Sequence, residues 1–521
     1  MKKLPGIFND VIGPVMRGPS SSHTAASWRI ARIAVQILNE PLEKALIEFD
    51  KDGAWAPNYR EQGTTIGIEG GLLELDITDE RMKNTIGYAS EKNVVIDYQV
   101  NSFPTHHANT VRLTLNGHSK KKVQLVAVSL GGGSFEISSV NGFNVNMYGD
   151  LFEIIIFTQN ETDISEKLKN NISTEVKFLF KQNEDFNMYE FKSSLPFSAD
   201  FISLLQENQQ IENIAVINPI LPVISGRESD MPFNSLPSLK KYAAEKSADL
   251  GELGLVYEKC ISGMSEQDLV LKMEEIIQII HKSIDVGLNG THYEDRILQQ
   301  QSHLIGKTEQ EGKIKDSIVN RIIENVSALM ESKSAMEVVV AVPTAGSCGT
   351  VGGTLLAVSK NIGSSKKELI KAYYAAGIVG AYFAQGPGFS AEEHGCQVEC
   401  GAASGMAAAG VVQLLGGSAE QALGAASMAI QNMIGLVCDP VADRVEVPCL
   451  GKNISAAVNA YSAALMAISG FDPVIPLEQV IQTVSRVSKT MPTCVKCTGR
   501  GGLAITETAT ILKRKLNTIV K

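Results

Sequence analysis

The sequence lacks several features that would define a protein class. Its first residues, MKKLPGIFNDVIG, include two lysines but no apolar run that ends in a small-residue cleavage site. We therefore expect no secretory signal and a cytoplasmic location. No dense basic stripe is present, and the formal net charge is −10 at pH 7. Both observations argue against nucleic acid as the main partner.

Three long stretches lack charged residues, namely 372–391, 401–419 and 422–437. Two of them approach the length of a membrane-spanning helix, about 20 residues. They are, however, richer in Ala, Gly and Ser than in Leu, Ile and Phe, and Pro387 interrupts the first. Because small residues let helices approach closely, this composition indicates tightly packed buried helices, and we expect no membrane partner.

Eight cysteines are present, and six of them lie between residues 396 and 497. In a long chain without an export signal, such thiols indicate metal binding or catalysis rather than disulfides. Structural zinc could use CVKC (494–497) with Cys396 and Cys400, although a second C-x-x-C pair is missing. A redox dithiol in CVKC would lack its usual βαβ setting. An iron–sulfur cluster with one open iron needs three rigidly held thiolates, and Cys438 and Cys449 stand beside prolines.

The hydrophobic pattern divides the chain into three regions and predicts a multidomain fold. Residues 1–147 are predicted to form an α+β domain, with a capped helix after SSSHT and several strands. Residues 148–222 show the order βαββαβ, which is typical of a ferredoxin-like, ACT-like module. Residues 226–238 are interpreted as a linker. Residues 235–521 are predicted to form an all-helical domain with functional loops between helices.

Three segments carry a resemblance to a known family: GPSSSHT (18–24), GCQVECGAASGMAAAG (395–410) and GLVCDPVADRVEVPCLGKN (435–453). Together they resemble the iron–sulfur-dependent L-serine dehydratases, or L-serine ammonia-lyases. The first segment is similar to the β part of that family and the other two to its α part, here fused in one chain. The order of the parts and the helical C-terminal domain also match.

The resemblance implies β-elimination of water from L-serine, which gives pyruvate and ammonia. It also implies a [4Fe–4S] cluster that acts as a Lewis acid. The motif matches place its ligands at Cys396, Cys438 and Cys449, with Cys400 as the rival for the first position.

A general base must complete such a site, and histidine is the usual choice. The candidates are His23, in SSSHT, and His107, in a segment similar to the family's H-x-N-x-x-R. His394 is interpreted as a neighbour of the metal ligand Cys396. The predicted substrate-binding residues lie beside these histidines and in the Gly-rich loop VPTAGSCGTVGG, which could cradle a carboxylate: Ser20, Ser22, Thr24, Asn109, Thr344, Gly346 and Ser347.

One departure from the family leaves the substrate open. Members of the family usually show G-H-G-T-D, whereas this chain has Gln62 at the histidine position and Thr65 at that of the acid. The alternatives are L-threonine or L-cysteine as the substrate, pyridoxal phosphate chemistry, for which no lysine motif is found, and a zinc-stabilised regulatory protein. We expect a homodimer that acts on a small amino acid.

Overall fold

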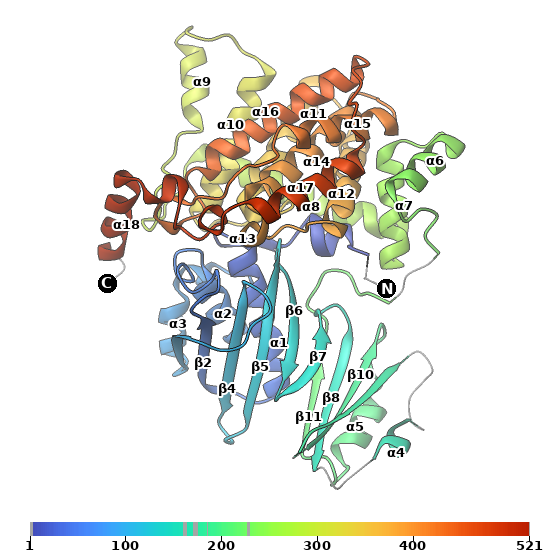
Figure 1. Ribbon diagram of the computed structural model, residues 1–521, viewed down its shortest axis with the longest axis vertical. Coiled ribbons are helices and arrows are strands. Elements are labelled where there is room, and N and C mark those ends of the chain that lie inside the picture. Colours follow the sequence, from blue (N-terminus) through green and yellow to red (C-terminus); the bar gives the residue numbers. More distant parts are fainter. Residues whose placement is uncertain (1–3, 160–163, 170–175, 185, 227–229, 520–521) are drawn as a thin grey trace.

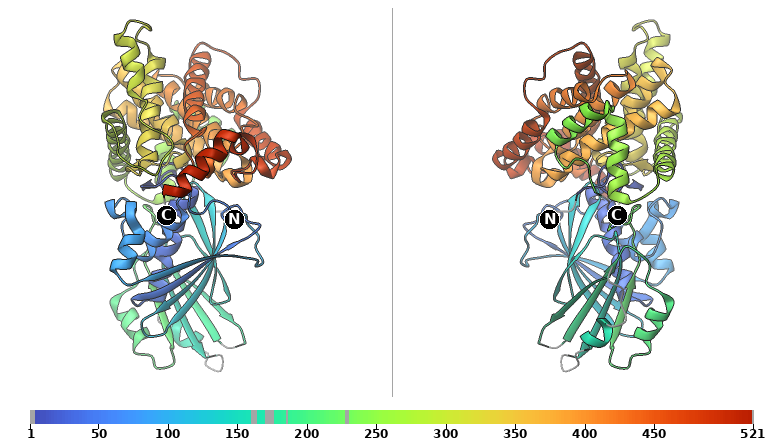
Figure 2. Two further views of the ribbon diagram at one scale, coloured as in Figure 1. Left: turned by 90° about the vertical axis from the view of Figure 1, so that its left-hand side faces the viewer. Right: turned by 90° about the vertical axis from the view of Figure 1, so that its right-hand side faces the viewer.

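The computed structural model describes residues 4–159, 164–169, 176–184, 186–226 and 230–519. Helices form one end of the molecule and two β-sheets form the other, as Figures 1 and 2 show. The N-terminal region mixes helices and strands, and the C-terminal region is helical. The prediction of a multidomain protein with these two kinds of region is therefore confirmed.

The larger sheet has six strands in the order β3-β2-β4-β5-β6-β7. All neighbours pair antiparallel except β2 and β3, which are parallel. Buried side chains alternate with less buried ones along β5 and β7, so one face of the sheet enters a core. The strands are β2 Leu42–Asp50, β3 Val95–Asn101, β4 Thr110–Gly117, β5 Lys122–Gly131, β6 Ser134–Val140 and β7 Phe143–Met147.

Helix α1 (Ala26–Leu38) shares this core, and it follows a π-helical turn, Ser21–Ala25. The Ser20 side chain caps the turn by accepting a hydrogen bond from the His23 N–H. The predicted capped helix after SSSHT is thus present. The hydrophobic pattern did not predict strands β6 and β7. It also did not predict the helices that follow β2 in the chain, α2 Thr64–Leu72 and α3 Thr85–Glu91.

The smaller sheet has four antiparallel strands in the order β11-β8-β10-β9. Helices α4 and α5 alternate with its strands in the predicted order, and the end of the expected first helix, 170–172, lies outside the described residues. The elements are β8 Phe152–Gln159, α4 Ser165–Lys169, β9 Lys177–Gln182, β10 Phe186–Ser193, α5 Ala199–Gln206 and β11 Asn213–Ile217.

Helix α14 lies inside the helical region and packs against α11, α12, α15 and α16. Among the described residues, no helix combines the length and the apolar character that a bilayer crossing requires. The helices are α6 Leu236–Lys246, α7 Leu250–Ser262, α8 Glu266–Asn289, α9 His303–Gln310, α10 Ile318–Ser334, α11 Cys348–Ile362, α12 Lys366–Gln385, α13 Ala391–His394, α14 Cys400–Leu414, α15 Ala419–Gln431, α16 Cys449–Ile468, α17 Leu477–Thr490 and α18 Glu507–Ile519.

Small residues allow these helices to touch backbone to backbone. A Cβ atom added to Gly410 would lie 3.0 Å from the Ala372 carbonyl oxygen, and one added to Gly405 would lie 3.2 Å from that of Ala426. This close approach explains why the uncharged stretches are rich in Ala and Gly rather than in Leu.

The first described residues of the chain pack against the helical region rather than against the two sheets. The turn Ile7–Val11 packs in the core of the helical region, and β1 (Val15–Met16) pairs with β12 (Val339–Val340). The Glu258 carboxylate accepts a hydrogen bond of 2.5 Å from the Ile7 N–H. This crossing leads the chain along the boundary between the two regions just before His23.

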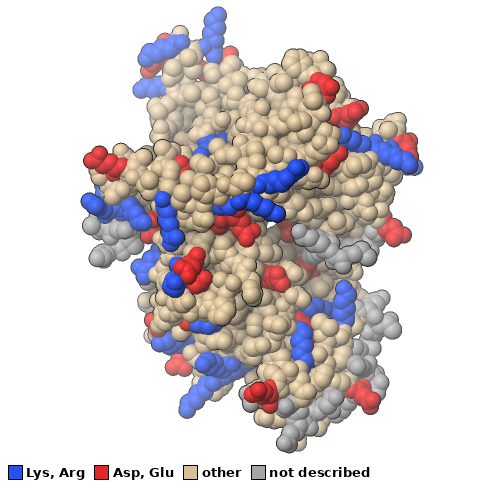
Figure 3. Space-filling model, viewed as in Figure 1, with Lys and Arg blue, Asp and Glu red and all other residues tan. Residues whose placement is uncertain are grey.

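On the face drawn in Figure 3, charges of both signs are scattered over both ends of the molecule.

We predict that Gly254→Ala destabilises the protein, because the new Cβ would lie 2.3 Å from the Tyr374 carbonyl oxygen of α12. The expected loss is about 1–3 kcal/mol of unfolding free energy. The matched control is Gly424→Ala, also inside a helix, where the nearest atom is 3.5 Å away. There alanine should be neutral or stabilising by about 0.5–1 kcal/mol. Thermal denaturation of the metal-free variants measures both effects, and equal melting temperatures would contradict the packing argument.

Candidate metal centre

Two of the predicted thiols meet at a buried point in the helical region. Cys396 Sγ, Cys438 Sγ and a Glu399 carboxylate oxygen lie within 4.8 Å of one another. Cys396 opens a short turn between α13 and α14. The turn is tied to the segment before Cys438, because the Gln397 N–H donates to the Leu436 carbonyl and the Gly435 N–H donates to the Gln397 side chain, at 3.1 and 2.9 Å.

The centre holds ionisable groups away from water. Burial raises the pKa of the Glu399 carboxyl to about 7, and one of its oxygens accepts a 2.7 Å hydrogen bond from Thr344. Hydrogen bonds with Cys396 and Cys497, together with burial, raise the pKa of the Cys438 thiol well above its ordinary value. A metal ion must displace the thiol protons, so binding at this point would release protons.

The loop between Cys438 and Cys449 is fixed at both ends by lysines, of which Lys452 is partly buried and Lys333 fully buried. The Lys452 ammonium donates to the Val437 carbonyl at 2.7 Å and to the Asp439 carboxylate at 2.6 Å. The Lys333 ammonium donates to the Val445 carbonyl. Glu446 accepts hydrogen bonds from the backbone N–H groups of residues 297 and 298, at 2.9 and 2.7 Å. The loop is therefore held from outside the centre by hydrogen bonds and ion pairs.

Cys449 begins α16 and packs beside Cys348 and Val445, in an apolar cluster next to that of Cys396. Burial raises the pKa of its thiol, and the neighbouring charges of Cys396 and Glu399 act in the same direction. The third predicted thiol thus lies within electrostatic reach of Cys396 but outside the closest group of three ligand atoms.

Cys497, which the sequence suggested only as part of a zinc site or redox pair in CVKC, also lies at this centre. Cys497 packs with Cys396 and Cys438, and a parallel backbone bridge joins residues 438 and 496. The N–H of Cys497 donates to the Cys438 carbonyl at 2.9 Å, and Gln62 donates to the Cys497 sulfur at 3.6 Å. The close pair in CVKC was the available sequence signal. Its partner Cys494 is exposed, so the pair does not act as one unit.

His23 lies fully buried at the boundary of the two regions. Its Nδ1 is 3.5 Å from a Glu392 carboxylate oxygen and 3.2 Å from Ser20 Oγ, and its ring packs on Trp55. Its Nε2 is 3.3 Å from Asn58 Oδ1. Burial lowers its pKa below 6.5, although Glu392 and Asn58 oppose the shift. Glu392 belongs to α13, whose Ala391 packs with Cys396, so the helix connects His23 to the thiols.

The tautomer of His23 follows from its partners. The Asn58 amide nitrogen donates to the Cys497 carbonyl at 3.0 Å, so its oxygen faces the imidazole. Nε2 then carries the proton and donates, which leaves Nδ1 as the basic atom. That atom faces Glu392 and Ser20.

The other predicted residues lie around this boundary with varied partners. His107 Nε2 is 3.4 Å from Glu393, and the buried amide oxygen of Asn109 has no hydrogen-bond partner among the described residues. Thr24 donates to the Gln62 carbonyl at 3.3 Å. Ser347 donates to the Val342 carbonyl at 3.2 Å.

The remaining candidates for substrate contact are also buried. Ser22 lies in the turn with His23. The Gly346 carbonyl accepts a 2.7 Å bond from Asn453, which also donates to the sulfur of Cys400, the rival ligand, at 3.7 Å. Two residues before Cys396 in the chain, His394 has Nε2 at 3.7 Å from Glu393.

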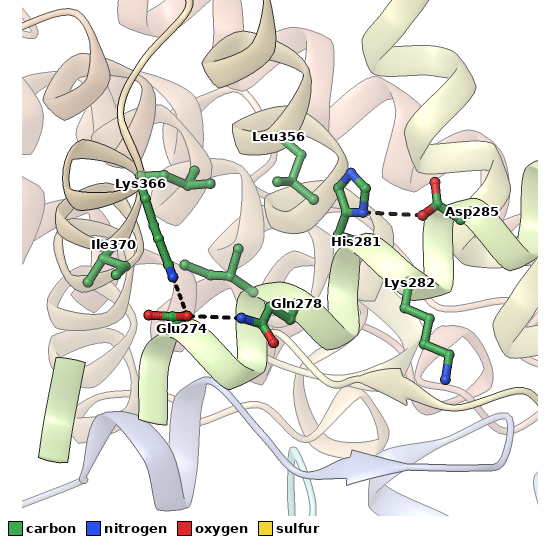
Figure 4. Close-up of a pocket in the computed structure, with 10 residues that line it drawn as sticks. Glu274, Gln278, His281, Lys282, Asp285, Leu356, Lys366 and Ile370 are labelled. Atoms are coloured by element: carbon green, nitrogen blue, oxygen red, sulfur yellow. Dashed lines mark hydrogen bonds and ion pairs between the residues drawn. The ribbon is translucent and has the colours of Figure 1, made fainter. Parts of the chain in front are cut away.

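The pocket drawn in Figure 4 is a separate hollow between α8, α11 and α12. Its floor is apolar, and its rim carries the pairs Glu274–Lys366 and His281–Asp285. No thiol lines it. The thiol centre is therefore the better candidate for chemistry.

Comparisons with known proteins identify the family of the chain. The family model of the serine dehydratase alpha chain matches residues 160–504. A probable L-serine dehydratase alpha chain of Bacillus subtilis (strain 168) is 34% identical over 290 residues, which are 54% of this chain and 95% of the relative. A probable L-serine dehydratase beta chain of the same organism is 39% identical over 154 residues, 30% of this chain and 68% of the relative. L-serine dehydratase 1 of Escherichia coli (strain K12) is 35% identical over 283 residues, 53% of this chain and 62% of the relative.

The fold and the site define a multidomain protein in which a helical region and a mixed α/β region enclose buried thiols and a buried histidine. The family model spans more than half of the chain, and relatives of both the alpha and the beta type match it. The chain belongs to the L-serine dehydratase family and combines the alpha and beta parts in one chain.

We predict that Lys452→Met destabilises the protein by about 3–5 kcal/mol, because it leaves the buried Asp439 carboxylate unpaired. The matched control is Lys366→Met, which removes an exposed ion pair with Glu274 and should cost at most about 1 kcal/mol. Chemical denaturation of the two metal-free variants measures the difference. Similar losses in both would show that Lys452 does not hold the loop.

Proposed function

We propose that the protein is an L-serine ammonia-lyase, which eliminates water from L-serine and gives pyruvate and ammonia. The observation that carries this proposal is the contact between His23 and Glu392, next to the buried Cys396 and Cys438 thiols. A base beside a metal-binding centre suits the removal of a weakly acidic proton and a poor leaving group. The names of the relatives support the same reaction.

We infer that Cys396, Cys438 and Cys449 hold a [4Fe–4S] cluster. Soft thiolate ligands suit iron–sulfur clusters, and all three thiols are buried and interact electrostatically. Two lysines fix the loop that carries Cys438 and Cys449, as rigid ligation requires. Such a cluster supplies an open Lewis-acidic iron for the carboxylate and β-hydroxyl of serine.

His23 is the proposed general base. Its Nδ1 takes the α-proton of the substrate, and the Glu392 carboxylate, 3.5 Å away, stabilises the imidazolium that forms. Asn58 holds the ring through Nε2. His107 stays the alternative base, because it also meets the α13 segment through Glu393.

Recognition of the substrate is assigned to groups near the boundary of the two regions. Asn109 could bind a polar substrate group through its unpaired amide oxygen. Ser20, Ser22 and Thr24 flank His23. In the loop with Thr344, Gly346 and Ser347, the backbone N–H groups of Thr344 and Ser347 donate to each other's hydroxyl oxygens, so the Gly346 N–H is the group proposed to bind the carboxylate. Gln62 faces Cys497 rather than acting as a base, so L-threonine and L-cysteine stay alternative substrates.

The surrounding architecture is proposed as follows. Residues 1–147 would form the α+β domain, 148–222 a ferredoxin-like, ACT-like module and 235–521 the catalytic domain. The strand order β11-β8-β10-β9, with two alternating helices, supports the module. We also propose a cytoplasmic homodimer that binds neither nucleic acid nor membrane.

Anaerobically reconstituted protein should release pyruvate and ammonia from L-serine faster than from L-threonine or L-cysteine. Cys438→Ser should lose bound iron and activity together. The matched control is Cys260→Ser, which changes a buried thiol on α7 away from the centre and should retain both. A Cys438→Ser variant with normal turnover would contradict the proposed centre, and preference for another amino acid would correct the substrate.

The proposed base predicts a definite pH dependence. His23 must be neutral to accept a proton, and its pKa lies below 6.5, so kcat/KM should fall on the acid side only below about pH 6.5. Glu392 raises this pKa, so Glu392→Gln should move the acid limb to lower pH. His23→Gln should lower kcat by about 100-fold or more with bound iron unchanged. If His107→Gln shows these effects instead, His107 is the base.

A further inference from the structure

Lys333 is a fully buried lysine that pairs with no carboxylate in the part of the chain that the structure describes. It lies in the last turn of α10 and is 0% exposed. Across the residues that the structure describes, the recorded hydrogen bond of its ammonium goes to the Val445 carbonyl, and no carboxylate lies within 4.0 Å. Other lysines near the interior do have carboxylate partners. The buried Lys192 pairs with Glu153 and Glu190, and the partly buried Lys452 pairs with Asp439.

Such an arrangement is costly in a protein interior. A buried charge loses its hydration, and an uncompensated one costs several kcal/mol. One carbonyl oxygen does not supply a countercharge, and an ammonium group has three N–H donors. The position of Lys333 therefore indicates that a neighbouring group becomes negatively charged in the active protein.

The surroundings indicate which anion that is. The Lys333 ammonium donates to Val445, which packs with the thiols of Cys348 and Cys449. The charges of Glu399 and Glu446 also reach Lys333, but among the described residues neither carboxylate lies within 4.0 Å of the ammonium. Of the two thiols, Cys449 is the proposed metal ligand. Its thiol becomes a thiolate when metal binds.

We propose that Lys333 is the countercation of the thiolate metal centre and that it positions the Cys449 ligand. The inference rests on the metal centre of the proposed function. Lys333 balances the negative charge of the ligated thiolates, and its bond to Val445 holds the loop that leads into Cys449. In the metal-free protein the same charge has no countercharge and lowers the free energy of unfolding. Lys333 therefore destabilises the metal-free chain but strengthens its retention of metal.

The test uses Lys333→Gln, which removes the charge and keeps an N–H donor for Val445, and Lys333→Met, which removes both. Lys366→Gln, at an exposed position, is the control. For each anaerobically reconstituted chain, the rate of iron loss to a chelator, the reduction potential of the bound iron and the melting temperature of the metal-free protein are measured.

Both Lys333 variants should lose iron about 10–100-fold faster than the wild type. Their bound iron should have a more negative reduction potential, because a nearby positive charge favours the reduced state. Metal-free Lys333→Gln should melt at or above the wild-type temperature. Wild-type iron retention in Lys333→Gln, or equal destabilisation of its empty and loaded forms, would overturn the inference. A wild-type chain that binds no iron would contradict this inference and the proposed centre together.

Discussion

The burial of thiols and charged side chains together, away from water, is the constraint on which this structure depends. Cys396, Cys438 and Glu399 bring their ligand atoms within 4.8 Å of one another. Such groups are tolerated in an interior only when hydrogen bonds, opposite charges or a metal compensate them. Lys452 and Lys333 supply the positive charges, and each also fixes the loop between the thiols.

Two features of the architecture position this centre: the close packing of the helices and the N-terminal segment that crosses from the helical region to the sheets. Glycines at helix contacts let α14 approach its neighbours, so that Cys396 and Cys400 lie on a rigid support. The N-terminal segment packs in the helical core at Ile7–Val11. It then continues to the boundary between the two regions, where His23 contacts Glu392. The centre therefore depends on both regions, as expected where alpha and beta parts of one family share a chain.

The sequence predicted the type of each region and most elements, because hydrophobic periodicity and the cap at Ser20 are local. It also identified Cys396 and Cys438, which the fold brings together. It did not predict strands β6 and β7, which are rich in Ser and Asn. Nor did it predict the contacts of Cys497, Asn58 and Lys333. These contacts join residues 439 and 112 positions apart in the chain, a separation that a local pattern does not encode.

Analysis of iron and acid-labile sulfide in the anaerobically reconstituted protein tests the central claim most directly. A cubane held by buried thiolates predicts about four irons and four sulfides per chain. Zinc bound without sulfide, or a chain that takes up neither metal, would contradict the account.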